Sequence, residues 1–159
     1  SAEFDGLIPE GLVAALVDIQ ARKIYDDVTA QAIVIDDRLD LAYDLKIAAG
    51  DVAYVQAAVL KILADIPAEF ALGQNYPNPF NPVTTIRFGL PEPRKIRITV
   101  INLLGQEIIE LVNGWKDIGR HEVIWQGQDQ NGRAVATGMY FTVLNDGNKI
   151  IVQKILLLK

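Results

Sequence analysis

The sequence predicts a two-domain protein, with a small all-α domain in residues 1–68 and an all-β sandwich of about seven antiparallel strands in residues 69–159. Apolar residues recur at helical spacing before a proline-rich stretch at 76–82, and they alternate with polar residues after it. Charge also divides the chain. Residues 1–68 carry twelve acidic and five basic side chains, a net charge of −7, whereas residues 69–159 carry eight acidic and ten basic ones, a net charge of +2.

Two segments of the N-terminal domain have the apolar spacing of amphipathic helices. In the first, Leu12, Leu16 and Ile19 recur at helical spacing in a segment that runs on towards Ile24. The second has one apolar stripe over about four turns. Its members are Val52, Val55, Val59, Ile62 and Ile66. We therefore expect two helices in this domain.

Acidic residues precede the second segment at the spacing of a calcium-binding loop. With Asp40 at loop position one, Asp44 falls at position five and Asp51 at position twelve. Carboxylates there would supply the oxygen ligands that calcium prefers. In the alternative interpretation these side chains are helix caps and a solvated surface, because Asp51 stands where it can accept hydrogen bonds from the free N–H groups of a helix start.

The run Lys46–Gln56 resembles the second calcium-loop helix of a dockerin module, and Asp5–Ile8 is a weaker match to the first. The resemblance implies two loop–helix units, a calcium ligand and a cohesin-like partner. Ala42, Leu45 and Ala48 occupy loop positions three, six and nine, where such loops carry ligands or glycine. We therefore expect a degenerate dockerin-like module that requires no cofactor, with calcium as its candidate ligand.

From Phe70 onward the pattern is that of half-buried β-strands. Strands are expected over residues 86–90, 96–100, around 108, and over 121–126, 139–144 and 149–158. The dipeptide Asn113-Gly114 and the segment Asn145–Asn148 have the composition of turns between strands. Six or seven short strands with regular turn signals predict an antiparallel sandwich of immunoglobulin type.

Four motifs follow one another in this domain: residues 72–82, Asn102–Glu107, Gly119–Trp125 and Gly138–Phe141, after which the chain closes on Lys154–Lys159. Together they closely resemble the type A C-terminal sorting domain of the type IX secretion system. That family is related to the immunoglobulin-like domain of the flagellar hook-capping protein. The resemblance therefore extends over the whole C-terminal half of the chain.

The resemblance implies that this domain is a secretion signal. The secretion machinery would carry the protein to the outer cell surface of a Gram-negative bacterium, or release it as a secreted protein. A sortase would cut the linker around residues 65–74 and attach the cargo to lipopolysaccharide. The expected sorting motif comprises Tyr76, Pro77, Asn78, Pro79, Phe80, Asn81, Pro82, Gly138, Lys154 and Lys159.

Several classes of function are excluded by composition. The acidic chain has no dense basic stripe, which argues against nucleic-acid binding. No apolar run approaches the length of a transmembrane segment. Cysteine is absent, Ser1 is the only serine and His121 the only histidine, so acyl-transfer triads are not expected. We expect a protein that is not an enzyme.

Each C-terminal motif also has a structural interpretation. The prolines would protect an edge strand, because proline cannot donate to a strand ladder. Trp125 and Tyr140 are predicted core aromatics, and Asp129–Gly132 is a predicted hairpin turn. Two other functions stay open: a dockerin-type adhesion or scaffold module that binds a cohesin-like partner, and an extracellular appendage subunit.

Overall fold

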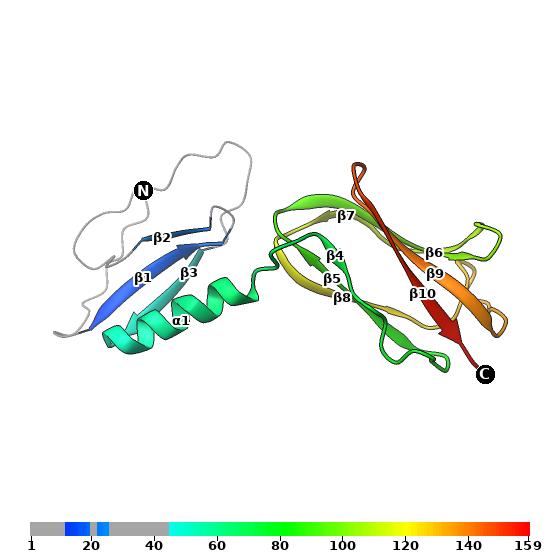
Figure 1. Ribbon diagram of the computed structural model, residues 1–159, viewed down its shortest axis with the longest axis horizontal. Coiled ribbons are helices and arrows are strands. Elements are labelled where there is room, and N and C mark those ends of the chain that lie inside the picture. The colour runs from blue at the N-terminus through cyan, green and yellow to red at the C-terminus, as the bar shows by residue number, and fades with distance from the viewer. Residues whose placement is uncertain (1–11, 20–21, 26–44) are drawn as a thin grey trace. The chain divides into compact units, whose positions relative to one another are not determined.

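The computed structural model describes residues 12–19, 22–25 and 45–159. The chain divides into two compact units, Ser1–Ile66 and Pro67–Lys159, each of which is described by itself (Figure 1). The sequence places the boundary between residues 68 and 69. Within the described residues, no helix has both the length and the hydropathy that spanning a membrane requires.

The first unit contains a sheet, so the prediction of an all-α domain is wrong. Its strands are β1 (Val13–Asp18), β2 (Lys23–Tyr25) and β3 (Leu45–Gly50), arranged antiparallel in the order β2-β1-β3. The first predicted helix therefore corresponds to β1 and β2. Residues 14–18 of the central strand are all buried. A strand buried on both faces has a continuous apolar run, in which a helical stripe can also be found.

The second predicted helix is confirmed as α1 (Val52–Asp65). Asp51 caps its N-terminus: one carboxylate oxygen accepts a hydrogen bond from Tyr54 N at 2.8 Å. Val55 and Val59 are the buried residues of the helix, which contacts β1 and β3. The middle of the predicted apolar stripe is therefore buried, whereas Val52 at its start is exposed.

The second unit consists of seven antiparallel strands in two sheets, as the period-two pattern predicts. The strands are β4 (Ala71–Leu72), β5 (Thr84–Leu90), β6 (Arg94–Asn102), β7 (Glu107–Lys116), β8 (Gly119–Trp125), β9 (Gly138–Asn145) and β10 (Ile150–Leu157). One sheet has the order β4-β5-β8 and the other the order β10-β9-β6-β7. Figure 1 shows the two sheets as the layers of a β-sandwich.

The core of the sandwich comes from alternate residues of both sheets. On β5 and β6 the buried series are those read from the sequence. They are Ile86, Phe88 and Leu90 on β5, and Ile96, Ile98 and Val100 on β6. Trp125 and Tyr140 lie in the same cluster, at 1% and 7% exposure, which confirms the prediction of core aromatics.

The Asn113-Gly114 dipeptide is not a turn. It lies inside β7, where Asn113 pairs with Arg97 and Gly114 with Ile96 on β6. The chain reverses later, in the two residues between β7 and β8. The ladder runs through both residues without a register shift; the shifts between β6 and β7 lie further along, after Ile98. The prediction failed because the register depends on β6 and not on local turn chemistry.

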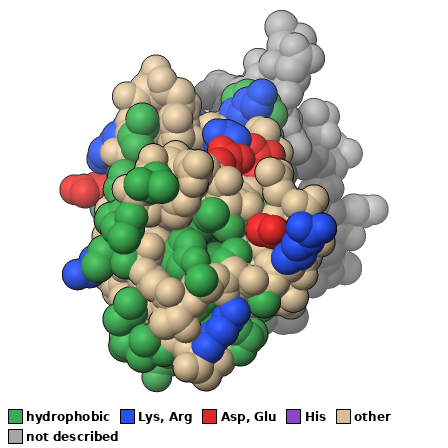
Figure 2. Space-filling view, turned by 90° about the vertical axis from the view of Figure 1, so that its right-hand side faces the viewer, with side chains coloured by type: hydrophobic (Ala, Val, Ile, Leu, Met, Phe, Trp, Pro, Cys, Tyr) green, Lys and Arg blue, Asp and Glu red, His purple; other side chains and the backbone are tan. Residues whose placement is uncertain are grey.

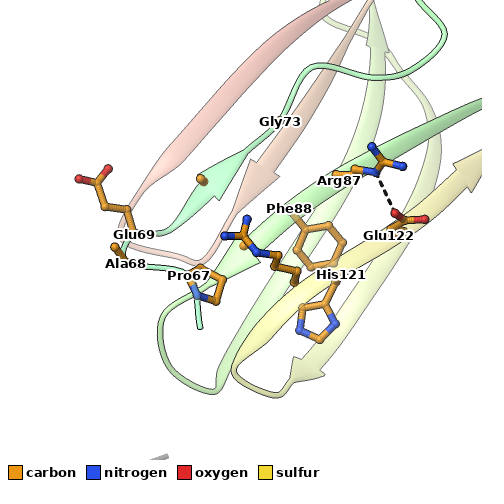
Figure 3. Close-up of a pocket in the computed structure, with 11 residues that line it drawn as sticks. Pro67, Ala68, Glu69, Gly73, Arg87, Phe88, His121 and Glu122 are labelled. Atoms are coloured by element: carbon orange, nitrogen blue, oxygen red, sulfur yellow. Dashed lines mark hydrogen bonds and ion pairs between the residues drawn. The ribbon is translucent and has the colours of Figure 1, made fainter. Parts of the chain in front are cut away.

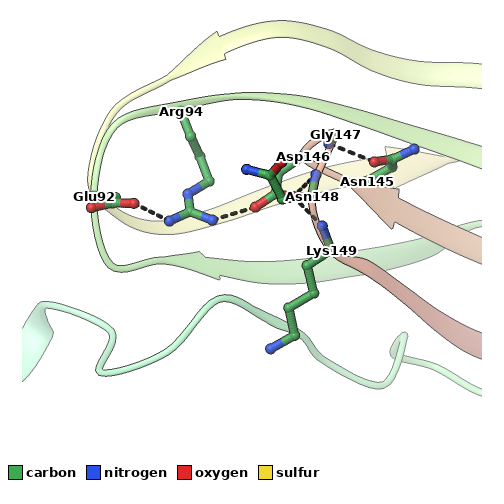
Figure 4. Close-up of polar contacts among 7 residues, drawn as sticks. All are labelled: Glu92, Arg94, Asn145, Asp146, Gly147, Asn148 and Lys149. Atoms are coloured by element: carbon green, nitrogen blue, oxygen red, sulfur yellow. Dashed lines mark hydrogen bonds and ion pairs between the residues drawn. The ribbon is translucent and has the colours of Figure 1, made fainter.

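A partly buried ion pair joins β6 to the turn between β9 and β10 (Figure 4). The Asp146 side chain is 4% exposed and accepts a hydrogen bond from one Arg94 Nη, while the other Arg94 Nη donates to exposed Glu92. Asp146 Oδ1 also accepts from the backbone N–H of Asn148 and Lys149, at 2.9 and 2.6 Å. One carboxylate therefore fixes both the turn and the arginine.

Candidate functional site

The proline-rich segment bridges the two sheets of the sandwich. Tyr76 pairs with Thr85 on β5 through two backbone hydrogen bonds of 2.9 Å. Four residues later, Phe80 N donates to Leu156 O at 3.0 Å and Phe80 O accepts from Leu158 N at 2.9 Å. The Tyr76–Pro77 and Asn78–Pro79 peptide bonds are cis. The segment therefore starts beside β5 and ends on the open edge of β10.

The Asn78 side chain also forms hydrogen bonds with the edge of β10. Its Oδ1 accepts from Leu156 N at 3.0 Å, and its Nδ2 donates to Lys154 O at 3.4 Å. Gln74 Nε2 donates to the same Lys154 carbonyl at 3.0 Å. A free strand edge invites pairing with another chain, and these amides occupy the C-terminal half of the β10 edge instead.

Asn75 holds the proline segment from inside. It is 2% exposed, and its Nδ2 donates to Pro77 O and to Thr84 Oγ1, both at 2.9 Å. Thr84 Oγ1 in turn donates to Pro77 O at 2.9 Å. Sequence reasoning did not select Asn75 or Thr84 as site residues. The signal for Asn75 was its place at the start of the motif, but nothing local marks Thr84 as its partner.

Phe80 anchors the segment in the core. Its side chain is 2% exposed, and its ring lies 5.3 Å from the ring of Trp125, which lies 5.4 Å from that of Tyr140. Both larger rings satisfy their polar atoms: Trp125 Nε1 donates to Gln128 O at 2.9 Å, and the Tyr140 hydroxyl donates to Ala136 O at 2.8 Å. Burial raises the pKa of Tyr140 above its ordinary value.

The structure brings most of the expected sorting motif to one end of the sandwich. Gly138 pairs with Leu157, the residue against which Phe80 also bridges. Lys154 is exposed on β10, and Lys159 Nζ donates to Val135 O. Tyr76 is 74% exposed, and Pro77, Asn78, Pro79, Asn81 and Pro82 are exposed with it.

Figure 2 views the molecule from the side on which β10 ends. Apolar side chains gather along one side of this face and line a hollow near its centre, with lysines and arginines spread around them. Exposed apolar residues of this end are found in the β6–β7 turn, at the start of β9 and after β10. They are Leu103, Leu104, Met139 and Leu158. We call this surface, together with Tyr76–Pro82, Lys154 and Lys159, the terminal face.

The calcium hypothesis concerns residues that the structure describes only in part. Asp40 and Asp44 lie outside the described residues, and Asp51 is the helix cap. Residues 45–50, positions six to eleven of the expected loop, form β3 and pair with β1. In the part of the chain that the structure describes, no three carboxylate, imidazole or thiol groups are placed to share a metal ion.

Calcium titration is the direct measurement. We expect no binding heat when micromolar calcium is titrated into the chain by calorimetry, because only three of the loop positions carry carboxylates. The Asp51→Asn variant is the matched control, since it keeps a cap acceptor and removes a carboxylate. A saturable heat that Asp51→Asn abolishes would contradict this expectation.

Comparison with known proteins gives a family match for the second unit. Residues 74–158 match the family described as the secretion system C-terminal sorting domain. A comparison with curated proteins found no match. Two solved structures from Porphyromonas gingivalis are similar. PorZ, described as an essential bacterial surface component of the type-IX secretion system, is 17% identical over 57% of this chain, with a TM-score of 0.40. Dimeric latent PorU is 12% identical over 95% of this chain, with a TM-score of 0.46. The chain spans 11% and 12% of their respective lengths.

Proposed function

Because the chain belongs to the family of secretion system C-terminal sorting domains, we propose that residues 69–159 form a type A sorting signal of the type IX secretion system. The family match over residues 74–158 carries this proposal. It supports recognition by the secretion machinery, a secreted or surface location, and a role without catalysis. Cleavage by a sortase in the linker around residues 65–74 and anchoring to the surface of a Gram-negative bacterium are parts of the same proposal.

The topology supports an immunoglobulin-like assignment for the sandwich. When the strands β4 to β10 are lettered A to G, strands A, B and E (β4, β5 and β8) form one sheet. Strands G, F and C (β10, β9 and β6) lie side by side in the other. The fourth strand, β7, pairs with β6 and so joins the C strand's sheet. This order is that of an immunoglobulin-type sandwich in which the fourth strand has changed sheets.

The terminal face supports a role in recognition. It unites the opening and the closing motifs of the family region, because Phe80 and Asn78 bind the last strand. Its exposed apolar residues and unburied lysines are the kind of surface that partner proteins bind. We propose that the secretion machinery recognises and binds the terminal face.

Export of a fusion tests the proposal. A folded reporter that carries residues 67–159 at its C-terminus is expected to reach the surface or medium of a host with a type IX secretion system. A host strain without the system is the control, and proteinase accessibility with fractionation gives the readout. Retention of a fusion that circular dichroism shows to be folded would contradict the sorting role.

Paired lysine variants in the same fusion test the terminal face. Lys154→Ala with Lys159→Ala is expected to reduce export severalfold, because both side chains lie on that face. The matched control is Lys95→Ala with Lys116→Ala, which removes two exposed lysines elsewhere on the same unit. Equal export of the two double variants would show that recognition does not depend on Lys154 and Lys159.

The described part of the first unit does not support the adhesion alternative. A dockerin-type module that binds a cohesin-like partner needs paired loop–helix units, whereas the described residues of this unit hold three strands and one helix. An appendage subunit would polymerise, so light scattering of the purified chain distinguishes it from a monomeric sorting tail.

A further inference from the structure

A second surface of the sandwich, apart from the terminal face, contains a groove, and five of its lining residues belong to the segment 65–74 in which the sorting proposal places cleavage. The groove has a volume of about 750 Å³ and lies over the sheet β4-β5-β8 (Figure 3). Its lining includes Pro67, Ala71, Gly73, Arg87 and Arg120. The residues of β5 that face the core alternate with Arg87, so this arginine lies on the face turned away from the core.

Small residues determine the shape of the groove. Ala71 and Gly73 present almost no side chain, which leaves a low floor at β4. Gly89 allows the wall to form, because a Cβ there would lie 3.0 Å from the Pro67 Cβ. Pro67 therefore packs directly on the strand and closes one side. The volume falls in the range of ligand sites and exceeds what a lone carboxylate or phosphate needs.

The lining carries two arginines and two glutamates, and both arginines have hydrogen-bond donors that no lining carboxylate uses. The Arg120 side chain is exposed and makes no hydrogen bond or ion pair with the residues that the structure describes. Arg87 uses its Nε for Glu122, at 2.8 Å, so its two terminal nitrogens stay available. The other acidic lining residue, Glu69, directs its carboxylate away from Arg87 and His121 (Figure 3). Two guanidinium groups thus face one carboxylate that is already paired.

A ring pair lies under the groove on the core side of the sheet, since Phe88 belongs to the hydrophobic core. The His121 ring stacks on Phe88 at 5.2 Å between centroids. His121 Nε2 lies 2.8 Å from Asp117 O, and because a carbonyl oxygen only accepts, this nitrogen carries the proton. On the outer side of the sheet, Pro67 supplies an apolar contact and the arginines supply charge.

We propose that this groove binds an acidic peptide of a partner protein in an extended conformation, with a carboxylate held by Arg120 and Arg87. Guanidinium groups bind carboxylates through paired hydrogen bonds, which gives both charge and orientation. The low floor at Ala71 and Gly73 admits the peptide backbone close to the sheet. Pro67 then contacts a small side chain that flanks the acidic residue.

Binding of a fluorescein-labelled hexapeptide of alternating glutamate and alanine to the full chain tests the proposal. We expect saturable anisotropy, weakened at least tenfold by Arg120→Ala, which corresponds to about 1.4 kcal/mol. The glutamine–alanine peptide is expected not to bind. Arg133→Ala is the matched control, because Arg133 is an exposed arginine of the same unit outside the groove. An equal loss in the two variants would overturn the proposal as nonspecific charge attraction.

A steric variant tests the groove without a change of charge. Ala71→Tyr places a ring over the floor from an exposed position and is expected to weaken binding as much as Arg120→Ala. Unchanged melting temperatures would show that both variants fold. Binding that survives Ala71→Tyr, or that inorganic phosphate displaces at the same concentration as the free peptide, would contradict an extended peptide as the ligand.

Discussion

Replacing Phe80 by alanine is expected to lower the free energy of unfolding of the second unit by about 3–5 kcal/mol. The ring is 2% exposed and contacts Trp125, so its removal leaves a cavity between the two sheets. The backbone bridge to Leu157 would remain available but would lose the side chain that seats it. Urea unfolding followed by tryptophan fluorescence measures the change.

Tyr76→Ala is the matched control for Phe80→Ala. It removes an aromatic ring from the same segment, but that ring is 74% exposed and the pairing with Thr85 uses only backbone atoms. We expect a change within about 0.5 kcal/mol. Similar losses in the two variants would mean that Phe80 is not the anchor of the proline segment.

Replacing Asp146 by asparagine is expected to cost about 2–3 kcal/mol. Asparagine keeps an oxygen that can accept from the turn N–H groups. The loss of stability therefore measures the contribution of the negative charge that faces Arg94. The Arg94 Nε is buried without a hydrogen-bond partner among the described residues, so this guanidinium has little other compensation. Its contact with the Phe70 ring, 5.0 Å from guanidinium carbon to centroid, would persist.

The same carboxylate makes stability depend on pH. Burial raises the pKa of Asp146, but hydrogen bonds from Lys149 N, Asn148 N and Arg94 outweigh it and hold the pKa below its ordinary value of 3.8. A carboxyl group with a lowered folded pKa stabilises the fold above its unfolded pKa and loses that contribution as the pH falls.

We therefore expect the wild-type and Asp146→Asn proteins to converge in stability as the pH drops below about 4, and to differ fully at neutral pH. Urea unfolding at a series of pH values gives the comparison. Glu92→Gln is the control, because Glu92 is the exposed partner of Arg94 and exposed pairs contribute little. A difference that does not vary with pH would contradict the electrostatic explanation.

The sequence predicted the second unit far better than the first. In the second unit, alternation on β5 and β6 is unambiguous because one face of each strand is polar at several positions. In the first, the stretch before Ile19 is almost entirely apolar, and both faces of β1 are buried. Periodicity cannot distinguish a strand from a helix in such a run. The segment forms a strand because it pairs with β3, which lies far along the chain.

The helix α1 was predictable because its signals are local. Asp51 marks the N-cap, and Val55 and Val59 lie one turn apart on the buried face. The β3 strand before it has no such signal: its burial pattern shows one buried residue in six. Its identity depends on hydrogen bonds to β1, which a local spacing of carboxylates could not reveal.

The candidate site was predictable as a set of motifs but not as a geometry. The order of motifs pointed to Tyr76–Pro82 and to Lys154–Lys159, yet nothing in either motif shows that Asn78 would bind the backbone of Leu156. Asn75 and Thr84 were missed for the same reason, because their partnership exists only once the chain folds back.

The bond from Leu156 N to Asn78 joins residues 78 positions apart, and this has a consequence for timing. During translation, the proline segment leaves the ribosome long before β10 is made, so its partners do not yet exist. The sandwich can close only after the last strand is released, and such distant contacts form slowly. A prematurely terminated chain that lacks β10 would leave Phe80 and Asn78 without their backbone partners. The closed terminal face therefore marks a chain whose synthesis has passed β10.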